Sequence, residues 1–180
     1  MVPRLKEKYL TEVRPQIMKQ FGITNVNAAP RIDKIVTNIG VGEAQREPQQ
    51  IEIAAEKLAA ITGQKAKITR ARKSISGFKL REGSIVGCTV TLRGARMYEF
   101  FDRLFNVAVP RVRDFRGLSP NAFDGGGNYT LGLRDITIFP EAGHSGDFVP
   151  GMNVTIVISN SKSAEQSREM LRQMGVPFSA

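Results

Sequence analysis

The chain has 180 residues, of which 41% are hydrophobic, and its 26 Lys and Arg against 17 Asp and Glu give a formal net charge of +9. This length predicts one domain, residues 1–180, since domains typically run to about 100–150 residues and single cores to roughly 250. The one cysteine excludes an internal disulfide and a Cys-rich metal site, no apolar run approaches the roughly 18 residues of a membrane span, and the N-terminus lacks a secretory signal. We therefore expect a cytoplasmic protein that binds an anionic partner and no membrane.

The first third of the chain predicts a helix, a strand and a second helix. Apolar residues recur every four positions over residues 5–21, which indicates a helix that Pro15 kinks or splits. Residues 31–41 predict a strand whose two faces alternate. One face is Ile35, Thr37 and Ile39, and the other is Lys34, Val36 and Asn38. The next helix has Pro48 in its first turn and ends at Gly63.

The middle of the chain predicts a strand at residues 64–70, a long loop to Ser84 and a strand at residues 85–93. The second of these strands has the clearest alternation, because Val86, Cys88, Val90 and Leu92 are apolar and the residues between them are not. One face is therefore buried, and the other presents Thr89, Thr91 and Arg93.

The last part of the chain predicts a helix at residues 95–109 that Pro110 ends, an irregular segment at 111–127, and strands at 129–139 and 152–159. The loop 140–151 joins these strands. A final helix begins near Ser163, whose capping-box partner is Gln166, and ends at Gly175.

The predicted order of elements is α-β-α-β-β-α-β-β-α, and its centre is a β-α-β-β-α-β run typical of ferredoxin-like folds. We therefore expect an α+β protein with a ferredoxin-like or RRM-like core. Helices would cover one face of a mostly antiparallel sheet, with extra helices at both termini, and the other face would stay free.

A basic stretch between Lys65 and Glu82 holds seven cations and one acid. Solvated surfaces usually mix both signs, so this excess favours binding to a nucleic-acid backbone. The free sheet face would add amide, hydroxyl and guanidinium groups that suit phosphate, ribose and base edges, although threonine also simply favours strands. Phe78 could stack on an exposed base. Since the strand centres lack aromatic residues, we expect recognition of a structured RNA by shape and backbone.

Catalytic and membrane functions receive less support. His144 lies in a loop-like context without a nucleophile or metal-ligand spacing, and Cys88 lies among apolar strand residues. Gly125–Gly127 leads into a strand, which favours a flexible turn over a phosphate loop. We expect no cofactor and no metal. An RNA-modifying or RNA-processing enzyme on a ferredoxin-like core is the alternative, and binding of residues 65–81 to acidic membranes is a weaker one because too few apolar residues accompany the charges.

Several motifs stand in a characteristic order along almost the whole chain. They are residues 34–42 (KIVTNIGVG), 73–83 (KSISGFKLREG), 110–117 (PRVRDFRG), 123–129 (FDGGGNY), 139–141 (FPE) and 151–154 (GMNV). Together they resemble the bacterial-type family of large-subunit ribosomal protein five. Each motif is weak by itself, and the ordered set is specific.

The resemblance implies a monomer that binds 5S ribosomal RNA in the central protuberance of the large subunit, beside other large-subunit ribosomal RNA. It assigns the 5S contacts to Lys34, Asn38, Gln64, Thr89, Thr91 and Arg93, with help from Lys65, Lys67 and Arg70. It assigns contacts with peptidyl-site transfer RNA to Lys73, Ser74, Ser76, Phe78, Lys79 and Arg81. It assigns an intersubunit bridge with small-subunit ribosomal protein thirteen to Arg111, Arg113, Asp114, Arg116, Glu141 and Asp147.

Overall fold

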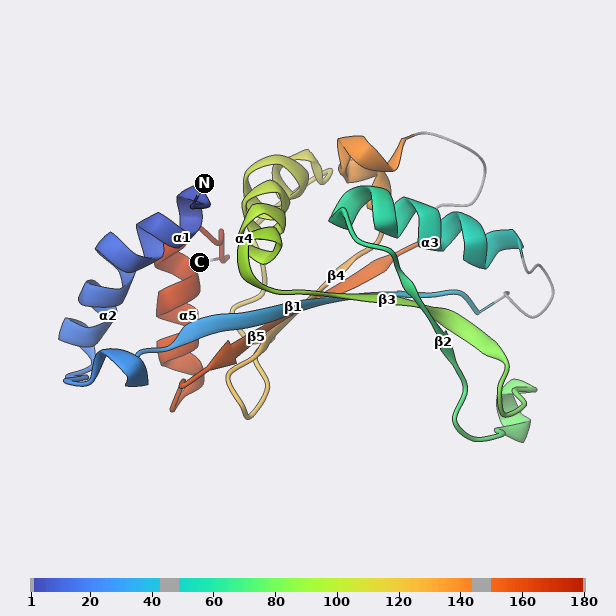
Figure 1. Ribbon diagram of the computed structural model, residues 1–180, viewed down its shortest axis with the longest axis horizontal. Helices are drawn as coiled ribbons and strands as arrows, with labels where there is room; N and C mark the ends of the chain where they lie inside the picture. The colour runs from blue at the N-terminus through green and yellow to red at the C-terminus, as the bar shows by residue number, and fades with distance from the viewer. Residues whose placement is uncertain (1, 43–48, 144–149, 180) are drawn as a thin grey trace. The chain divides into compact units, whose positions relative to one another are not determined.

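The computed structural model describes residues 2–42, 49–143 and 150–179 and shows the expected α+β fold (Figure 1). The strands are β1 (Arg31–Gly40), β2 (Lys67–Arg70), β3 (Ile85–Leu92), β4 (Tyr129–Leu133) and β5 (Met152–Ser159). The α-helices are α1 (Arg4–Lys8), α2 (Arg14–Gln20), α3 (Gln49–Thr62), α4 (Gly94–Arg103) and α5 (Ala164–Gln173). The five strands form one open sheet in the order β2-β3-β1-β5-β4, so the ferredoxin-like core is confirmed.

β1 lies between β3 and β5, and the two outer strands are β2 and β4. The prediction of one strand over residues 129–139 was wrong beyond Leu133. A short 3₁₀ helix at Ile136–Ile138 replaces it, and a second 3₁₀ helix follows at Pro140–Ala142. The cause is local, because the Asp135 carboxylate accepts a hydrogen bond from the Thr137 N–H at 2.6 Å and bends the chain into a turn.

Residues 1–35, 92–131 and 155–180 form the first of two compact units. Its core includes the fully buried Phe100, Phe101 and Leu104. The predicted kink at Pro15 takes the form of a wide π-helical turn at Tyr9–Val13 between α1 and α2. Pro15 then lies in the first turn of α2, where a missing N–H breaks no helical bond. A second π turn, Leu104–Ala108, extends α4.

Residues 36–91 and 132–154 form the second unit, in which α3 lies on one side of the strands (Figure 1). The helix buries the stripe that the sequence predicts, including Ile51, Leu58 and Ile61. Thr37 and Ile39 of β1 are fully buried, while the alternating positions Val36 and Asn38 are only half-buried. The alternation therefore places the free face where the sequence predicts it. Whether residues 1–180 form a single domain stays a prediction.

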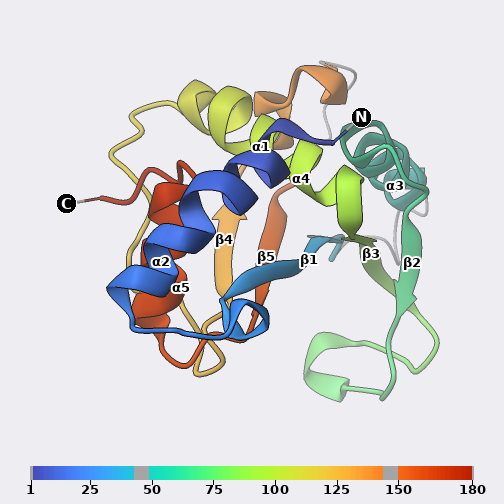
Figure 2. The ribbon, with the colours of Figure 1, turned by 60° about the vertical axis from the view of Figure 1, so that its left-hand side comes forward.

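β2 and β3 form an antiparallel ribbon that ends in a small turn (Figure 2). β2 begins at Lys67, three residues later than predicted, and its register shifts between Thr69 and Arg70. Backbone hydrogen bonds between Ala71 and both Gly83 and Ser84 continue the ribbon beyond the named strands. At the end, Ile75 bridges to Leu80 around a 3₁₀ turn.

Candidate nucleic-acid interface

The outward side of the second unit presents polar groups from β1, β2, β3 and the short segment that leads into β2. We call this surface the free sheet face; it comprises Asn38, Gln64, Lys65, Lys67, Arg70, Thr89 and Thr91. Cys88 and Val90 are buried on the opposite side of β3. Period-two alternation therefore directs Thr89 and Thr91 outward, as the sequence predicts.

Close approach of β3 to β1 aligns these groups. Gly87 makes it possible, because a Cβ atom at this position would lie 2.3 Å from the carbonyl oxygen of Ile39. The Thr89 hydroxyl donates to the carbonyl of Thr37 at 2.8 Å, across the two strands. The hydroxyl is thereby fixed, and its oxygen can still accept a hydrogen bond from a ligand.

Two side-chain amides are held against β3 in a similar way. The Asn38 Nδ2 atom donates to the Cys88 carbonyl at 3.4 Å, and the Gln64 Nε2 atom donates to the Thr91 carbonyl at 3.3 Å. Each amide uses a donor on the protein and keeps its carbonyl oxygen as an acceptor for a ligand. Acceptors held this way suit ribose hydroxyls and the amino groups of bases.

Three cations accompany these polar groups. Lys67 lies opposite Thr89 in the β2–β3 register, so the two side chains project from the same side of the ribbon. Arg70 donates to the Gly83 carbonyl at 3.0 Å, and Lys65 is exposed. None of the three forms an ion pair with another described residue. Their charge is therefore available to an anionic partner.

Two other predicted contacts, Lys34 and Arg93, belong to the first unit and are described with it. Lys34 is half-buried. Arg93 is exposed, and its guanidinium donates to the Asp33 carboxylate at 3.1 Å. The sequence did not indicate a role for Asp33. No local pattern shows that this acid on β1 pairs with Arg93, which follows β3. The pair orients the guanidinium, although an exposed ion pair contributes little to stability.

The segment at the end of the ribbon, residues 71–84, is named the tip loop. It carries the six side chains predicted to contact transfer RNA: Lys73, Ser74, Ser76, Phe78, Lys79 and Arg81. Phe78 is 79% exposed, and Lys79 adopts a left-handed backbone conformation with φ of 52°. The Ser74 hydroxyl accepts the N–H of Glu82 at 2.9 Å. The sequence predicts only a loop here, whereas local hydrogen bonds make it an ordered turn that presents an aromatic ring.

The residues predicted to form the bridge lie in separate units. Arg111, Arg113, Asp114 and Arg116 are all exposed in the first unit, and Asp114 has a positive φ of 52°. Glu141 is exposed in the second unit. Asp147 lies outside the described residues, as do His144 and Pro48.

The other features considered for chemistry have structural roles. Cys88 is completely buried, and burial raises the pKa of its thiol to about 11, so it is a poor nucleophile. The Gly125–Gly127 segment is a turn in which the Asp124 carboxylate accepts the N–H groups of Gly126 and Asn128. Hydrogen bonds to Asn128 are the main reason that the pKa of Asp124 is lowered. Within the described ranges, acidic, Cys and His side chains form no cluster that could hold a metal ion.

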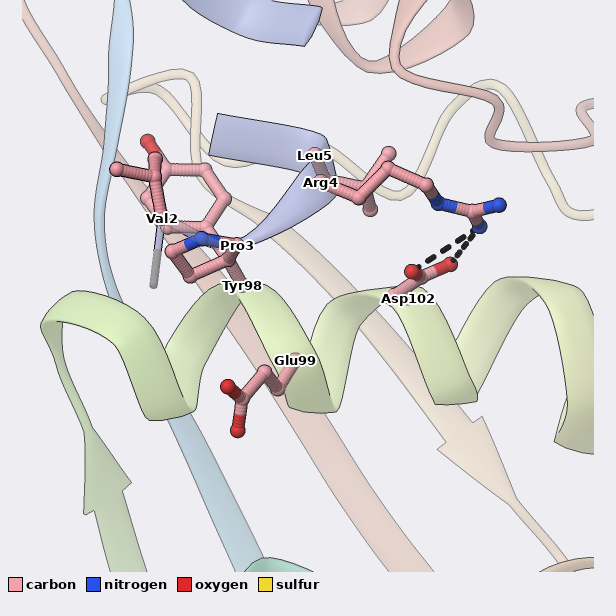
Figure 3. Close-up of a pocket in the computed structure, with 7 residues that line it drawn as sticks. All are labelled: Val2, Pro3, Arg4, Leu5, Tyr98, Glu99 and Asp102. Carbon is pink, nitrogen blue, oxygen red and sulfur yellow. Dashed lines mark hydrogen bonds and ion pairs between the residues drawn. The ribbon is translucent and has the colours of Figure 1, made fainter. Parts of the chain in front are cut away.

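A hollow of about 220 Å³ lies between the N-terminal residues and α4 in the first unit (Figure 3). Arg4 donates to both carboxylate oxygens of Asp102, at 2.7 and 3.0 Å. Asn106 donates to the same carboxylate. The Asp102 carboxylate is thus already engaged within the protein, and the described residues that line the hollow include no Ser, Cys or His. The hollow therefore gives no support to an enzymatic function. No helix among the described residues is both long and apolar enough to cross a membrane.

Comparison with known proteins covers almost the whole chain. Residues 25–81 match the family model described as ribosomal protein L5, and residues 85–178 match that described as the ribosomal L5P family C-terminus. The large ribosomal subunit protein uL5 of Moorella thermoacetica is 54% identical over 176 residues, 97% of each chain. Those of Anaeromyxobacter sp. (strain K) and Brevibacillus brevis are 53% and 52% identical over 179 residues, 99% of each chain.

Proposed function

Because the chain belongs to the bacterial-type ribosomal protein L5 family, we propose that its free sheet face binds 5S ribosomal RNA. The chain is a structural constituent of the large ribosomal subunit, located in the bacterial cytoplasm, and is not an enzyme. It associates with ribosomal RNA in that particle. The proposal adds that the RNA bound at the free sheet face is 5S, which the chain would anchor in the central protuberance.

The arrangement of the two amides carries this proposal. Asn38 and Gln64 are each tied to a backbone carbonyl of β3 and keep an acceptor free. Held groups lose little conformational freedom on binding, which favours recognition of one RNA shape. Lys65 and Lys67 add attraction to phosphate that does not depend on sequence. In the first unit, Lys34 and the Asp33-oriented Arg93 would make further 5S contacts.

Two further contacts belong to the same proposal. The tip loop would meet peptidyl-site transfer RNA through Phe78 and its neighbouring cations. The segment of Arg111, Arg113, Asp114 and Arg116, with Glu141 and Asp147, would meet small-subunit ribosomal protein thirteen. The free protein would be a monomer, which sedimentation equilibrium can measure.

Titration of the purified chain with 5S ribosomal RNA tests the central assignment. We expect tighter binding to 5S than to an unrelated folded RNA of equal length, with the preference kept as salt rises and nonspecific contacts weaken. Asn38→Ala and Arg93→Ala should each weaken 5S binding by about 1–3 kcal/mol. Equal affinity for the two RNAs at every salt concentration would exclude specific 5S recognition.

A further inference from the structure

A cavity of about 190 Å³ in the first unit is lined by cations that the proposed function does not use. Lys6 comes from α1, Arg14 begins α2 and Arg31 begins β1, and the rings of Tyr9 and Tyr98 also line the cavity. No acidic residue is among the described side chains that line it. Three elements thus bring positive charge to one hollow.

The three cations have no ion-pair partner within residues 2–42, 49–143 and 150–179. Lys6 and Arg31 are exposed, and Arg14 is half-buried. Tyr9 donates to the Pro30 carbonyl at 2.8 Å, and burial raises its pKa to about 12 although Arg14 and Arg31 oppose that rise. Tyr9, Arg14 and Arg31 thus line the same cavity.

The rim of the cavity is partly apolar. Leu10 is 38% exposed and Val26 is 48% exposed, so aliphatic surface borders the charged hollow. Asn27 beside them is exposed, and its backbone is held because its carbonyl accepts a hydrogen bond from Asn160 at 2.8 Å. An acidic peptide would need only the cations for binding and would leave the apolar rim without a role. A nucleotide would use the cations for its phosphate and the apolar rim and amide for its base.

We propose that this cavity is a second RNA contact, which receives the phosphate and adjoining base of an unpaired nucleotide in the large ribosomal RNA of the subunit. It uses none of the residues of the free sheet face. The inference rests on membership of the large subunit for the source of the RNA, and it does not depend on the 5S assignment.

Neutralising the cavity tests the electrostatic part of the proposal. The triple variant Lys6→Gln, Arg14→Gln, Arg31→Gln is compared with Lys162→Gln, Arg168→Gln, Arg172→Gln, which removes equal charge at exposed positions of the same unit. Each is titrated with protein-free large-subunit ribosomal RNA that lacks 5S, across salt concentrations. The cavity variant should lose about tenfold or more in affinity, and its slope of log affinity against log salt should fall by about 0.7–0.9 for each phosphate contact removed. Equal losses in both variants, or no loss in the cavity variant, would overturn the proposal.

Photo-cross-linking identifies the occupant directly. A benzophenone amino acid replaces Leu10 at the rim or, as a control, Val107, which is 37% exposed elsewhere in the first unit. Each chain is assembled into large subunits and irradiated. Cross-links from position 10 to large-subunit ribosomal RNA at higher yield than from position 107 are expected. Cross-links only to protein, or equal yields from both positions, would overturn the proposal.

A 5S titration separates this inference from the proposed function. The cavity variant should keep its affinity for 5S within about threefold, whereas Asn38→Ala should lose about fivefold or more. If the cavity variant binds large-subunit ribosomal RNA normally while Asn38→Ala still weakens 5S binding, only the cavity inference is overturned. If the cavity variant loses affinity for large-subunit ribosomal RNA while Asn38→Ala binds 5S normally, only the 5S assignment is overturned.

Discussion

The free sheet face and the tip loop carry similar kinds of side chain and hold them differently. On the face, Asn38, Gln64 and Thr89 are each tied to a backbone carbonyl of a neighbouring segment. In the tip loop, Phe78 is 79% exposed and its turn is held mainly by bonds within residues 71–84. Held groups suit a permanent RNA partner, and an exposed ring on a local turn suits a partner that comes and goes.

Gly87→Ala should have the largest effect on this comparison. Its added Cβ would meet the Ile39 carbonyl oxygen at 2.3 Å, so β3 and β1 must separate and the face must distort. We expect a loss of about 2–4 kcal/mol in the free energy of unfolding, measured by urea denaturation. Gly77→Ala in the tip loop is the matched control, because a Cβ there has no atom within 4 Å. One transition in the wild type would also support the single-domain prediction.

Phe78→Ala should affect the tip loop and leave the free sheet face unchanged. Because the ring is 79% exposed, its removal should change the free energy of unfolding by less than about 0.5 kcal/mol. If the ring stacks on a base of transfer RNA, binding of transfer RNA to reconstituted ribosomes should weaken by about 1–3 kcal/mol. Unchanged transfer-RNA binding together with weakened 5S binding would show that the roles are reversed.

Thr89→Val should have a smaller effect, confined to the free sheet face. The substitution keeps the shape of the side chain and removes the hydroxyl that donates to the Thr37 carbonyl. Loss of this hydrogen bond should cost about 1 kcal/mol in the free energy of unfolding, with a similar loss in 5S affinity. Thr69→Val on β2 is the control, and wild-type values for Thr89→Val would show that the hydroxyl does not order the face.

The smallest effect is expected in the alkylation rate of the Cys88 thiol. The thiol is fully buried and burial raises its pKa to about 11, so iodoacetamide at pH 8 should react only when β3 opens. Bound 5S should slow this reaction further, and Phe78→Ala should leave its rate unchanged. Rapid alkylation of the free protein would contradict the rigid face on which the comparison rests.

The sequence predicts the free sheet face well because alternation in β1 and β3 is a local signal. Ile35, Thr37 and Ile39 are buried and Thr89 and Thr91 point outward, as period two requires. The Ser163 cap is confirmed for the same reason, since its hydroxyl accepts the Gln166 N–H at 3.4 Å.

Features that depend on strand pairing or on side-chain competition were not predictable in the same way. The Asp33–Arg93 pair joins residues 60 positions apart, and nothing local in the sequence brings them together. Residues 134–139 have the apolar content of a strand, but one Asp135 hydrogen bond redirects the backbone. The position of β5 beside β1 likewise depends on pairing across the whole sheet.

A paired 5S titration of Asn38→Ala and Lys79→Ala tests whether 5S binds the free sheet face or the tip loop. Both positions lie in the second unit, and each substitution removes one polar side chain from one of the two regions. We expect Asn38→Ala to weaken 5S binding by about 1–3 kcal/mol and Lys79→Ala to change it by less than about 0.5 kcal/mol. A larger loss from Lys79→Ala than from Asn38→Ala would contradict the assignment of 5S to the free sheet face.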